Sequence, residues 1–540
     1  MTTNTLPVNY QPDYIIVGGG TAGCVIASCL SSYLPHKQVL LIEAGPSDFN
    51  DTKVLQLKEW LSLLGDPAYD YDYPTTEQPM GNSHIRHSRA KILGGCSSHN
   101  TLISFRPLKH DLQRWESAGV KGWDFATVQR CLDQIRCRVH PVHPRHRNQL
   151  VKDWVTTCSK ALDIPVIDDF NKPIREQGGF AEGVGFFSVA YEPEEGTRSS
   201  ASVAYLHPIF SGEEKRGNLL VLTEAWVSRV NLSAQASSQR AKKAESITLT
   251  LKSGKKLNLA AKHEIILCGG SIDTPKLLLH SGIGPAGQLS SLGIPVQHNL
   301  AGVGENLLDH PESIIIWELH EAMPPETTMH SDGGIFLDRT GTGAPDLMMH
   351  TYQIPFCVNT SRLGFEAPLH AFCMTPNIPR PKSVGRLYLS SKDPNVKPAL
   401  DFRYFTDPEG YDAKTLVDGF RAARKVAEME PFKRYLKREV APGPECVTDE
   451  QLSKYGRRVA HTVYHPAGTA KMGDPRVDEM AVVDPELKLV GVEGIRIADA
   501  SVFPSMVTVN PMLTVLAIGE RAAEMIAETQ GWRRELKPML

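Results

Sequence analysis

Two polar residues near the end of the chain, His465 and Asn510, have side chains that could act on a hydroxyl group. A neutral imidazole can accept a hydroxyl proton, and a neighbouring amide can donate a hydrogen bond to the resulting alkoxide or fix the ring. Asn510 precedes Pro511, which restricts its backbone and favours a rigid, extended approach to the imidazole. The pair is a candidate acid–base site, with a purely structural role for each residue as the alternative.

A glycine run near the start of the chain has the spacing of a dinucleotide-binding turn. The apolar residues 13–17 predict a buried strand, and a helical pattern covers 22–30. Between them, Gly18 permits the turn, Gly20 lets the backbone approach a pyrophosphate, and Gly23 lets the helix pack closely on the strand. The order strand, tight turn, helix is the one that dinucleotide binding requires.

Glu43 adds an acid at the expected distance from this turn. It follows a second predicted strand, 39–42, about 20 residues after the last glycine. Its carboxylate can accept hydrogen bonds from a ribose 2′-hydroxyl, which favours a cofactor without a 2′-phosphate.

Length and composition limit the class of protein. A chain of 540 residues is too long for one compact core, which predicts two domains. The net charge of −3 and the absence of long like-charge runs predict no nucleic-acid partner. Ten cysteines without metal-like spacing predict reduced thiols and no metal site.

Targeting features are also missing from the sequence. Residues 1–11 have no basic start or apolar core, and no segment offers the about 18 uncharged apolar residues that span a bilayer. We expect no membrane association and a cytoplasmic location. The last residues, 537–540, are not a Ser-Lys-Leu peroxisomal signal, so peroxisomal import is unsupported without being excluded.

Three separated segments have nucleotide-domain character. A strand at 263–268 runs into glycines and a helix through 274–278, where Pro275 suits a first helical turn. Residues 495–499 form a strand that ends in Asp499, and a helix over 513–528 closes the chain. We predict a discontinuous α/β, Rossmann-like domain and a second α+β substrate domain with an antiparallel sheet. The expected boundaries are 1–159, 216–311 and 461–540 for the first domain, and 160–215 and 312–460 for the second.

Several motifs in one order resemble the glucose-methanol-choline (GMC) flavoprotein oxidoreductases. The resemblance covers nearly the whole chain and rests on Gly18–Gly23 with Glu43, Gly94–Asn100, Gly269–Pro275, His465–Thr469 and Asn510–Pro511. Within the family, the chain resembles the choline-oxidising members, through Val54–Leu57 with Trp60, Gly196–Ser200, Asp309–Glu312, Asp346–His350 and Val463–His465.

This resemblance implies FAD as the cofactor. The implied cofactor-binding residues are Gly18, Gly20, Gly23, Glu43, Gly95, Ser98, His99, Asn100, Asp499, Asn510 and Pro511. His99 matches the histidine that is covalently bonded to the flavin in the choline-oxidising members, so a covalent link is expected here. His350 would hydrogen-bond the substrate oxygen or help to hold the alkoxide.

The same resemblance implies a subsite for a quaternary ammonium group. Such a cation donates no hydrogen bonds, so carboxylate charge and aromatic faces must bind it. Glu312 is the expected carboxylate, Trp60 and Phe356 are two expected aromatic walls, and Thr101 stands where those relatives have serine. A further tryptophan of those relatives is missing, because His330-Ser331 precedes the Gly334-Ile335-Phe336 run.

The implied function is FAD-dependent oxidation of choline to glycine betaine through betaine aldehyde. Oxygen would be the electron acceptor and hydrogen peroxide a product, in a homodimer. The alternatives are a GMC dehydrogenase or oxidase for another primary alcohol, a hydroxynitrile lyase that binds FAD without redox turnover, and a non-catalytic FAD-binding protein.

Overall fold

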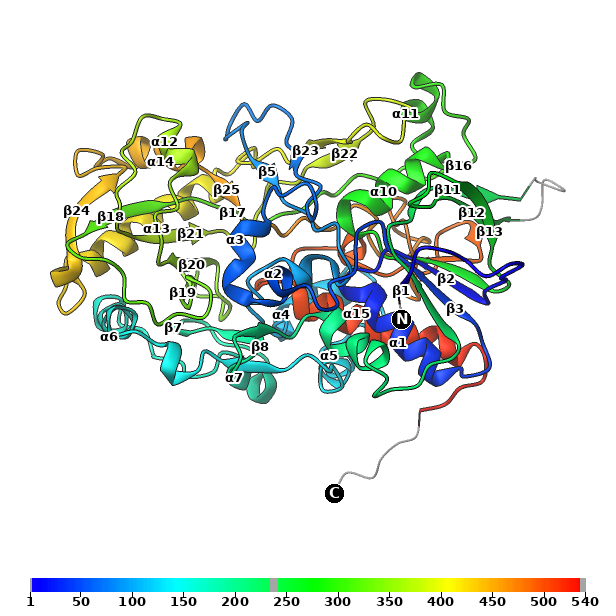
Figure 1. Ribbon diagram of the computed structural model, residues 1–540. Coiled ribbons are helices and arrows are strands. Elements are labelled where there is room, and N and C mark those ends of the chain that lie inside the picture. Colours follow the sequence, from blue (N-terminus) through cyan, green and yellow to red (C-terminus); the bar gives the residue numbers. More distant parts are fainter. Residues whose placement is uncertain (1, 234–240, 535–540) are drawn as a thin grey trace.

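The computed structural model describes residues 2–233 and 241–534. Two large sheets lie toward opposite ends of the molecule (Figure 1). Both belong to one continuous hydrophobic core, which includes Ile15 of the first sheet and Ile335 of the second. The predicted fold class, a Rossmann-like part joined to an α+β part with an antiparallel sheet, is confirmed, whereas the predicted domain boundaries stay a prediction.

The first sheet is parallel throughout and has the strand order β1-β10-β3-β2-β14-β27. Its strands are β1 (Thr2–Thr3), β10 (Leu219–Leu222), β3 (Val39–Ile42), β2 (Tyr14–Val17), β14 (Glu264–Leu267) and β27 (Ile495–Ile497). The strand order changes direction beside β2, which lies between β3 and β14. Ligands bind at such a switch point, outside the carboxyl ends of the strands, and Gly18 follows β2 directly.

Two buried helices cover this sheet near the switch point. Helix α1 (Thr21–Tyr33) begins in the glycine run, and α15 (Met512–Glu528) packs along it (Figure 1). A Cβ on Gly23 would lie 2.0 Å from the Gly18 carbonyl oxygen, so only glycine allows this approach. The predicted strand, turn and helix are therefore confirmed, with the role expected for Gly23.

The second sheet is antiparallel and carries part of the candidate site. Its eight strands are β24 (Leu436–Ala441), β18 (Ile315–Leu319), β21 (Ala371–Asn377), β20 (Leu347–Tyr352), β19 (Gly333–Leu337), β7 (Gly183–Phe186), β17 (Pro311–Glu312) and β25 (His461–Thr462). His350 on β20 pairs with Gly334 on one side and Thr375 on the other, so it lies inside the sheet.

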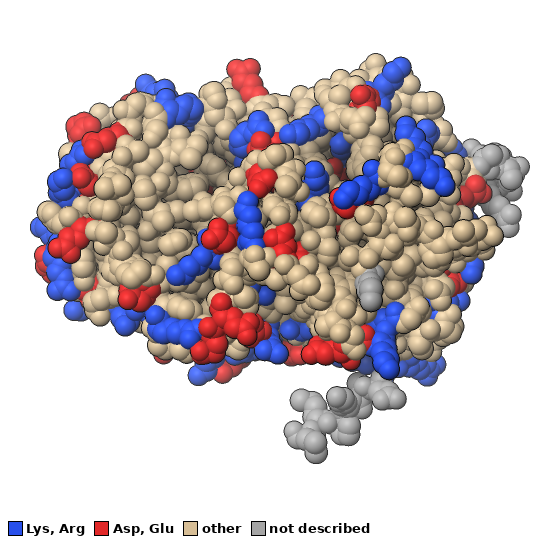
Figure 2. All heavy atoms as spheres, viewed as in Figure 1, with Lys and Arg blue, Asp and Glu red and all other residues tan. Residues whose placement is uncertain are grey.

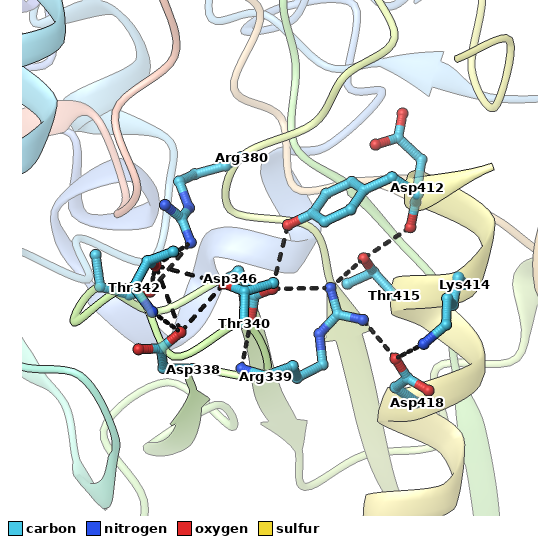
Figure 3. Close-up of polar contacts among 12 residues, drawn as sticks. Asp338, Arg339, Thr340, Thr342, Asp346, Arg380, Asp412, Lys414, Thr415 and Asp418 are labelled. Atoms are coloured by element: carbon cyan, nitrogen blue, oxygen red, sulfur yellow. Dashed lines mark hydrogen bonds and ion pairs between the residues drawn. The ribbon is translucent and has the colours of Figure 1, made fainter. Parts of the chain in front are cut away.

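A polar network fixes the β19–β20 hairpin to helix α13 (Tyr411–Ala427) (Figure 3). Arg339 Nη2 donates to Asp346 Oδ2 at 3.1 Å and to Thr415 Oγ1 at 2.6 Å, and Arg339 Nη1 donates to Asp418. Asp346 is fully buried. Its charge is compensated by Arg339, and the network restrains the strand that carries His350.

Smaller sheets and helices complete the fold. The remaining strands are β4 (Tyr73–Pro74), β5 (Arg86–His87), β6 (Val139–Pro141), β8 (Ser188–Glu192), β9 (Thr197–Arg198), β11 (Trp226–Leu232), β12 (Lys242–Thr250), β13 (Lys256–Ala260), β15 (Ile283–Gly284), β16 (His298–Asn299), β22 (Arg386–Tyr388), β23 (Ala399–Asp401) and β26 (Val492–Glu493). The remaining α-helices are α2 (Thr52–Leu55), α3 (Trp60–Leu63), α4 (Lys109–Ser117), α5 (Phe125–Leu132), α6 (Gln149–Leu162), α7 (Asn171–Gln177), α8 (Ala201–Tyr205), α9 (His207–Phe210), α10 (Gly270–His280), α11 (Ala286–Ser291), α12 (Val358–Ser361) and α14 (Asp449–Arg458). The 3₁₀ helices are η1 (Leu57–Glu59), η2 (Gly95–Ser98), η3 (Pro144–His146), η4 (Lys433–Tyr435) and η5 (Ala500–Val502).

The prediction for Pro275 is wrong, because this residue lies inside α10 and not in its first turn. Proline has no N–H, so the Ser271 carbonyl loses its helical donor. The Thr469 hydroxyl donates to that carbonyl at 2.6 Å instead. Helix α10 begins earlier than expected because Asp499 accepts a hydrogen bond from the Gly270 N–H at 2.8 Å.

The state of the cysteines and the distribution of surface charge are as expected from the sequence. All ten cysteines are free thiols, and eight of them are buried. On the face in Figure 2, acidic and basic side chains are interspersed. Among the described residues, no helix combines the length and apolar character needed to cross a bilayer.

We expect Gly23→Ala to destabilise the protein by about 1 to 3 kcal/mol, because the added methyl group meets backbone and not a flexible side chain. Denaturant unfolding and the flavin-to-protein absorbance ratio would measure the loss. Gly287→Ala in α11 is the matched control, since its Cβ would meet nothing within 4 Å. Equal stability of the two variants would contradict the packing role of Gly23.

Candidate active site

One cavity connects the switch point of the parallel sheet with the end of β20. Residues predicted from the sequence that line it are Gly18, Gly20, Glu43, Trp60, Gly95, His99, Asn100, Thr101, His350, His465, Asp499, Asn510 and Pro511. The fold therefore brings the predicted dinucleotide-binding residues and the predicted acid–base residues to one space. Four other predicted residues do not line it: Gly23, Ser98, Glu312 and Phe356.

Glu43 is held rigidly at the dinucleotide end of the cavity. Its Oε2 accepts from the Gly19 N–H and its Oε1 from the Gly45 N–H, both at 2.8 Å. Burial raises the pKa of Glu43 to about 7, and the two backbone donors act against that shift. Gly18 has φ +103°, and Gly20 lines the cavity, so a ligand can reach the backbone next to this carboxylate.

Ser98 supports its loop and does not face the cavity. Its hydroxyl lies 3.2 Å from Asp48 Oδ2 and 3.3 Å from Ser200 Oγ. Gly94 and Gly95, with φ of +87° and +55°, turn the chain sharply before η2. A Cβ on Gly95 would lie 2.7 Å from the Gly20 Cα, so this loop lies directly against the dinucleotide-binding turn.

His99 follows this loop and is almost completely buried at the cavity wall. Its Nε2 lies 3.2 Å from the Leu63 carbonyl oxygen and 3.3 Å from Ser88 Oγ. Asp70 Oδ2 is 3.7 Å from the same nitrogen. Burial lowers the pKa of His99 to about 4 despite Asp70, so the imidazole is neutral and one ring nitrogen keeps a lone pair.

A second histidine fixes the tautomer of His465. The Nε2 of His310 lies 3.0 Å from both the Pro379 and the Val507 carbonyl oxygens, so it must carry the proton. The Nδ1 of His310 is then an acceptor, and the Nδ1 of His465, 2.8 Å away, must donate to it. This assignment leaves Nε2 of His465 as the nitrogen that can accept a proton.

The electrostatics of the two rings support this assignment. Burial lowers the pKa of His310 to about 4 and the pKa of His465 well below its ordinary value, with further depression of the latter by His310. Both rings are therefore neutral before reaction. A neutral His465 has the unprotonated nitrogen that a proton acceptor needs.

Asp309 holds the backbone of His465. Its Oδ1 accepts from the His465 N–H at 3.0 Å, and its Oδ2 accepts from the Tyr404 hydroxyl at 2.6 Å. Burial raises the pKa of Asp309 to about 6, and these donors oppose the shift. Asp309 is thus a positioning residue for His465.

Three buried polar atoms near His465 have no hydrogen-bond partner among the described residues. They are Asn510 Oδ1, His350 Nε2 and Glu312 Oε2. Buried polar atoms are normally paired, so an unpaired one next to a cavity is a place where a ligand can supply the partner. Each of the three belongs to a residue that the sequence assigned to substrate or catalysis.

The predicted substrate residues are arranged around β20. Trp60 and Thr101 line the cavity, and Trp60 Nε1 donates to the Met329 carbonyl at 2.9 Å. Glu312 Oε2 lies 3.9 Å from His350 Nδ1. Phe356 stacks on Tyr352, with ring centroids 4.8 Å apart.

Four residues of the site had no role predicted from the sequence: Asp309, His310, Tyr352 and Tyr464. The first two belong to a motif in which only Glu312 received a role, and Tyr464 lines the cavity beside His465. Tyr352 had a usable signal. It lies two residues after His350 on the same strand, and residues two apart in a strand share a face.

Comparisons with known proteins agree with this geometry. GMC oxidoreductase family models match residues 12–312 and 381–519. Choline oxidase from Arthrobacter globiformis is 40% identical, covering 95% of this chain and 94% of that protein. Oxygen-dependent choline dehydrogenase from Staphylococcus saprophyticus is 34% identical, with coverage of 95% and 94%. The solved structure of pyridoxine 4-oxidase from Mesorbium loti has a TM-score of 0.85 at 25% identity, covering 95% of this chain and 99% of that one.

The chain therefore belongs to the GMC oxidoreductase family. Within that family it is a flavin-dependent alcohol oxidase that is similar to choline oxidase. Its cofactor is FAD, and the cavity fits such a group, since the backbone of Gly18 and Gly20 lines it and the fixed carboxylate of Glu43 suits an adenosine ribose.

Proposed function

We propose that the protein oxidises choline to glycine betaine in two steps, through betaine aldehyde. The observation that carries this proposal is the buried carboxylate of Glu312. Its side chain is 2% exposed, Oε2 has no hydrogen-bond partner among the described residues, and the nearest basic group is His350 Nδ1 at 3.9 Å. Its Oε1 accepts only a long hydrogen bond from the Tyr352 hydroxyl at 3.4 Å. A buried carboxylate without a cationic partner is costly, and a cationic substrate would offset that cost. The 40% identity to choline oxidase supports the same substrate.

In this proposal, His465 accepts the hydroxyl proton at Nε2. The His310 ring holds His465 through Nδ1, and Asp309 holds its backbone, so the acceptor nitrogen does not rotate away. The Asn510 amide N–H and His350 Nε2, carrying the ring proton, donate hydrogen bonds to the alkoxide oxygen; His350 Nε2 has no partner among the described residues. When bound, FAD would supply the acceptor for the hydride of the substrate carbon; that hydride and the hydroxyl proton together would reduce O₂ to hydrogen peroxide.

The same residues can perform the second oxidation. The hydrate of betaine aldehyde is again an alcohol, and it keeps the trimethylammonium group. His465 can therefore take a hydroxyl proton from the hydrate while Glu312 balances the same positive charge. One site thus serves both steps, which end at the carboxylate of glycine betaine.

We also propose that the FAD is covalently linked through His99. The residue lies in the cavity wall, and burial keeps its imidazole neutral and nucleophilic. The loop between Gly94 and Asn100 lies against the dinucleotide-binding turn, so the ring is close to any bound cofactor. The cytoplasmic location and the homodimer stay predictions.

Another primary alcohol remains the competing substrate, and the fold likeness to pyridoxine 4-oxidase gives one candidate. We expect choline to bleach the flavin of the anaerobic protein faster and at lower concentration than 3,3-dimethylbutan-1-ol, its neutral isostere, or pyridoxine. Oxygen uptake with peroxide formation should accompany aerobic turnover. A preference for a neutral alcohol would overturn the choline assignment, and no bleaching by any alcohol would favour a lyase or a non-catalytic protein.

Glu312→Gln is the control for this substrate panel, because it keeps the shape and removes the charge. It should weaken choline binding by about 30-fold or more while binding of the neutral isostere changes little. Equal losses for both alcohols would give Glu312 a structural role only.

His465→Ala should slow flavin reduction at saturating choline by roughly 10² to 10⁴, the range for loss of a positioned acid–base group. Anaerobic stopped-flow absorbance measures this rate, and the flavin-to-protein ratio checks that FAD is retained. His140→Ala, at an exposed position on β6, is the matched histidine control. An unchanged rate for His465→Ala would remove this residue from the chemistry.

For the covalent link, we expect acid-precipitated wild-type protein to stay yellow and its intact mass to include one FAD. His99→Asn should release the flavin on precipitation, because an amide cannot replace the imidazole as nucleophile. His465→Ala should keep the linked flavin and thereby control for general damage to the cavity. Complete release from the wild type, or retention by His99→Asn, would contradict the assignment.

A further inference from the structure

The aromatic subsite predicted from the sequence lacks a tryptophan, and the structure places another aromatic ring at the cavity. Tyr352 ends β20 and lines the cavity two residues after His350. Because side chains two apart in a strand share a face, the ring lies on the same side of β20 as the candidate catalytic histidine. No sequence motif had assigned a role to Tyr352.

Two contacts hold this ring in place. Its face stacks on Phe356, with ring centroids 4.8 Å apart and planes inclined by 26°. Its hydroxyl donates to Glu312 Oε1 at 3.4 Å. Phe356 in turn packs edge-on against His461, whose strand pairs with that of Glu312. The orientation of Tyr352 is therefore fixed at one face of its ring and at its hydroxyl.

The carboxylate and the phenol differ in their access to the cavity. Glu312 does not line it, whereas Tyr352 does. A cation in the cavity would thus meet the ring of Tyr352 and interact with the Glu312 charge beyond it. Burial and the neighbouring Glu312 raise the pKa of Tyr352 well above its ordinary value, so the phenol keeps its proton and remains a donor. A phenol that donates to a carboxylate has an electron-rich ring, which favours a cation at its face.

We propose that the Tyr352 ring is a wall of the ammonium subsite and, together with Glu312, determines selectivity for a quaternary ammonium alcohol. This inference rests on the proposed choline oxidation. In this proposal the Tyr352 ring takes the place of the aromatic wall that the chain lacks at His330-Ser331, and Phe356 supports the ring from behind.

The test compares choline with 3,3-dimethylbutan-1-ol in anaerobic flavin titrations of the FAD-loaded protein. Tyr352→Leu removes the aromatic face, so the preference for choline should fall by roughly 2- to 30-fold relative to the wild type. Tyr352→Phe keeps the face and the stacking, so it should retain most of the preference. Tyr352→Met, which is flexible and apolar, repeats the ring deletion if the leucine variant does not fold.

Two results would overturn the proposal. One is a Tyr352→Leu or Tyr352→Met variant that prefers choline over 3,3-dimethylbutan-1-ol as strongly as the wild type does, because the ring would then be dispensable. The other is a loss in Tyr352→Phe as large as in Tyr352→Leu, because the hydroxyl and not the ring would then carry the effect. Failure of the choline assignment is distinguishable, since it would appear as a missing preference for choline in the wild-type protein itself.

Discussion

Burial of polar groups around one cavity is the constraint on which the rest of the structure depends. Most of these groups are compensated within the protein. The carboxylate of Glu43 accepts two backbone hydrogen bonds, and Asp309 accepts from Tyr404 and from the backbone of His465. These hydrogen bonds hold the cavity wall in one shape, because breaking them would leave the buried carboxylate of Glu43 or Asp309 without a partner. Among the unpaired buried atoms, we expect those of Asn510 and His350 to contact a ligand and the Glu312 charge to act on it from behind the wall.

Buried hydrogen bonds also determine the proton positions on the histidine pair, His310 and His465. Two carbonyl oxygens near the Nε2 of His310 determine where its proton lies, and that choice determines the proton position on His465. In our proposal, the proton-accepting nitrogen is thus selected by main-chain groups of residues that do not line the cavity. A neutral ring needs no counter-ion, so the pair can be buried without the carboxylate partner that a charged histidine would require.

The GMC fold brings these groups together from two sheets of one chain. The parallel sheet supplies the switch point at Gly18, and the antiparallel sheet delivers His350, Tyr352 and Glu312 from the opposite side. The two sheets share one core, so the cofactor residues and the substrate residues hold fixed relative positions. In our proposal, the cation subsite lies beside the reacting group because the end of β20 carries both His350 and the aromatic ring of Tyr352.

The sequence by itself determined the elements whose signals are local. The glycine turn, helix α1, strand β3 and Glu43 were predictable because periodicity and spacing within about 30 residues define them. Tertiary structure decided what depends on distant partners. Pro275 lies inside α10 because Asp499, far along the chain, accepts from Gly270 at the start of that helix. The tautomer of His465 depends on His310 and on two carbonyl oxygens from separate segments, and the position of Tyr352 depends on Glu312 and Phe356. No local pattern encodes those contacts, because they exist only once the two sheets enclose the cavity.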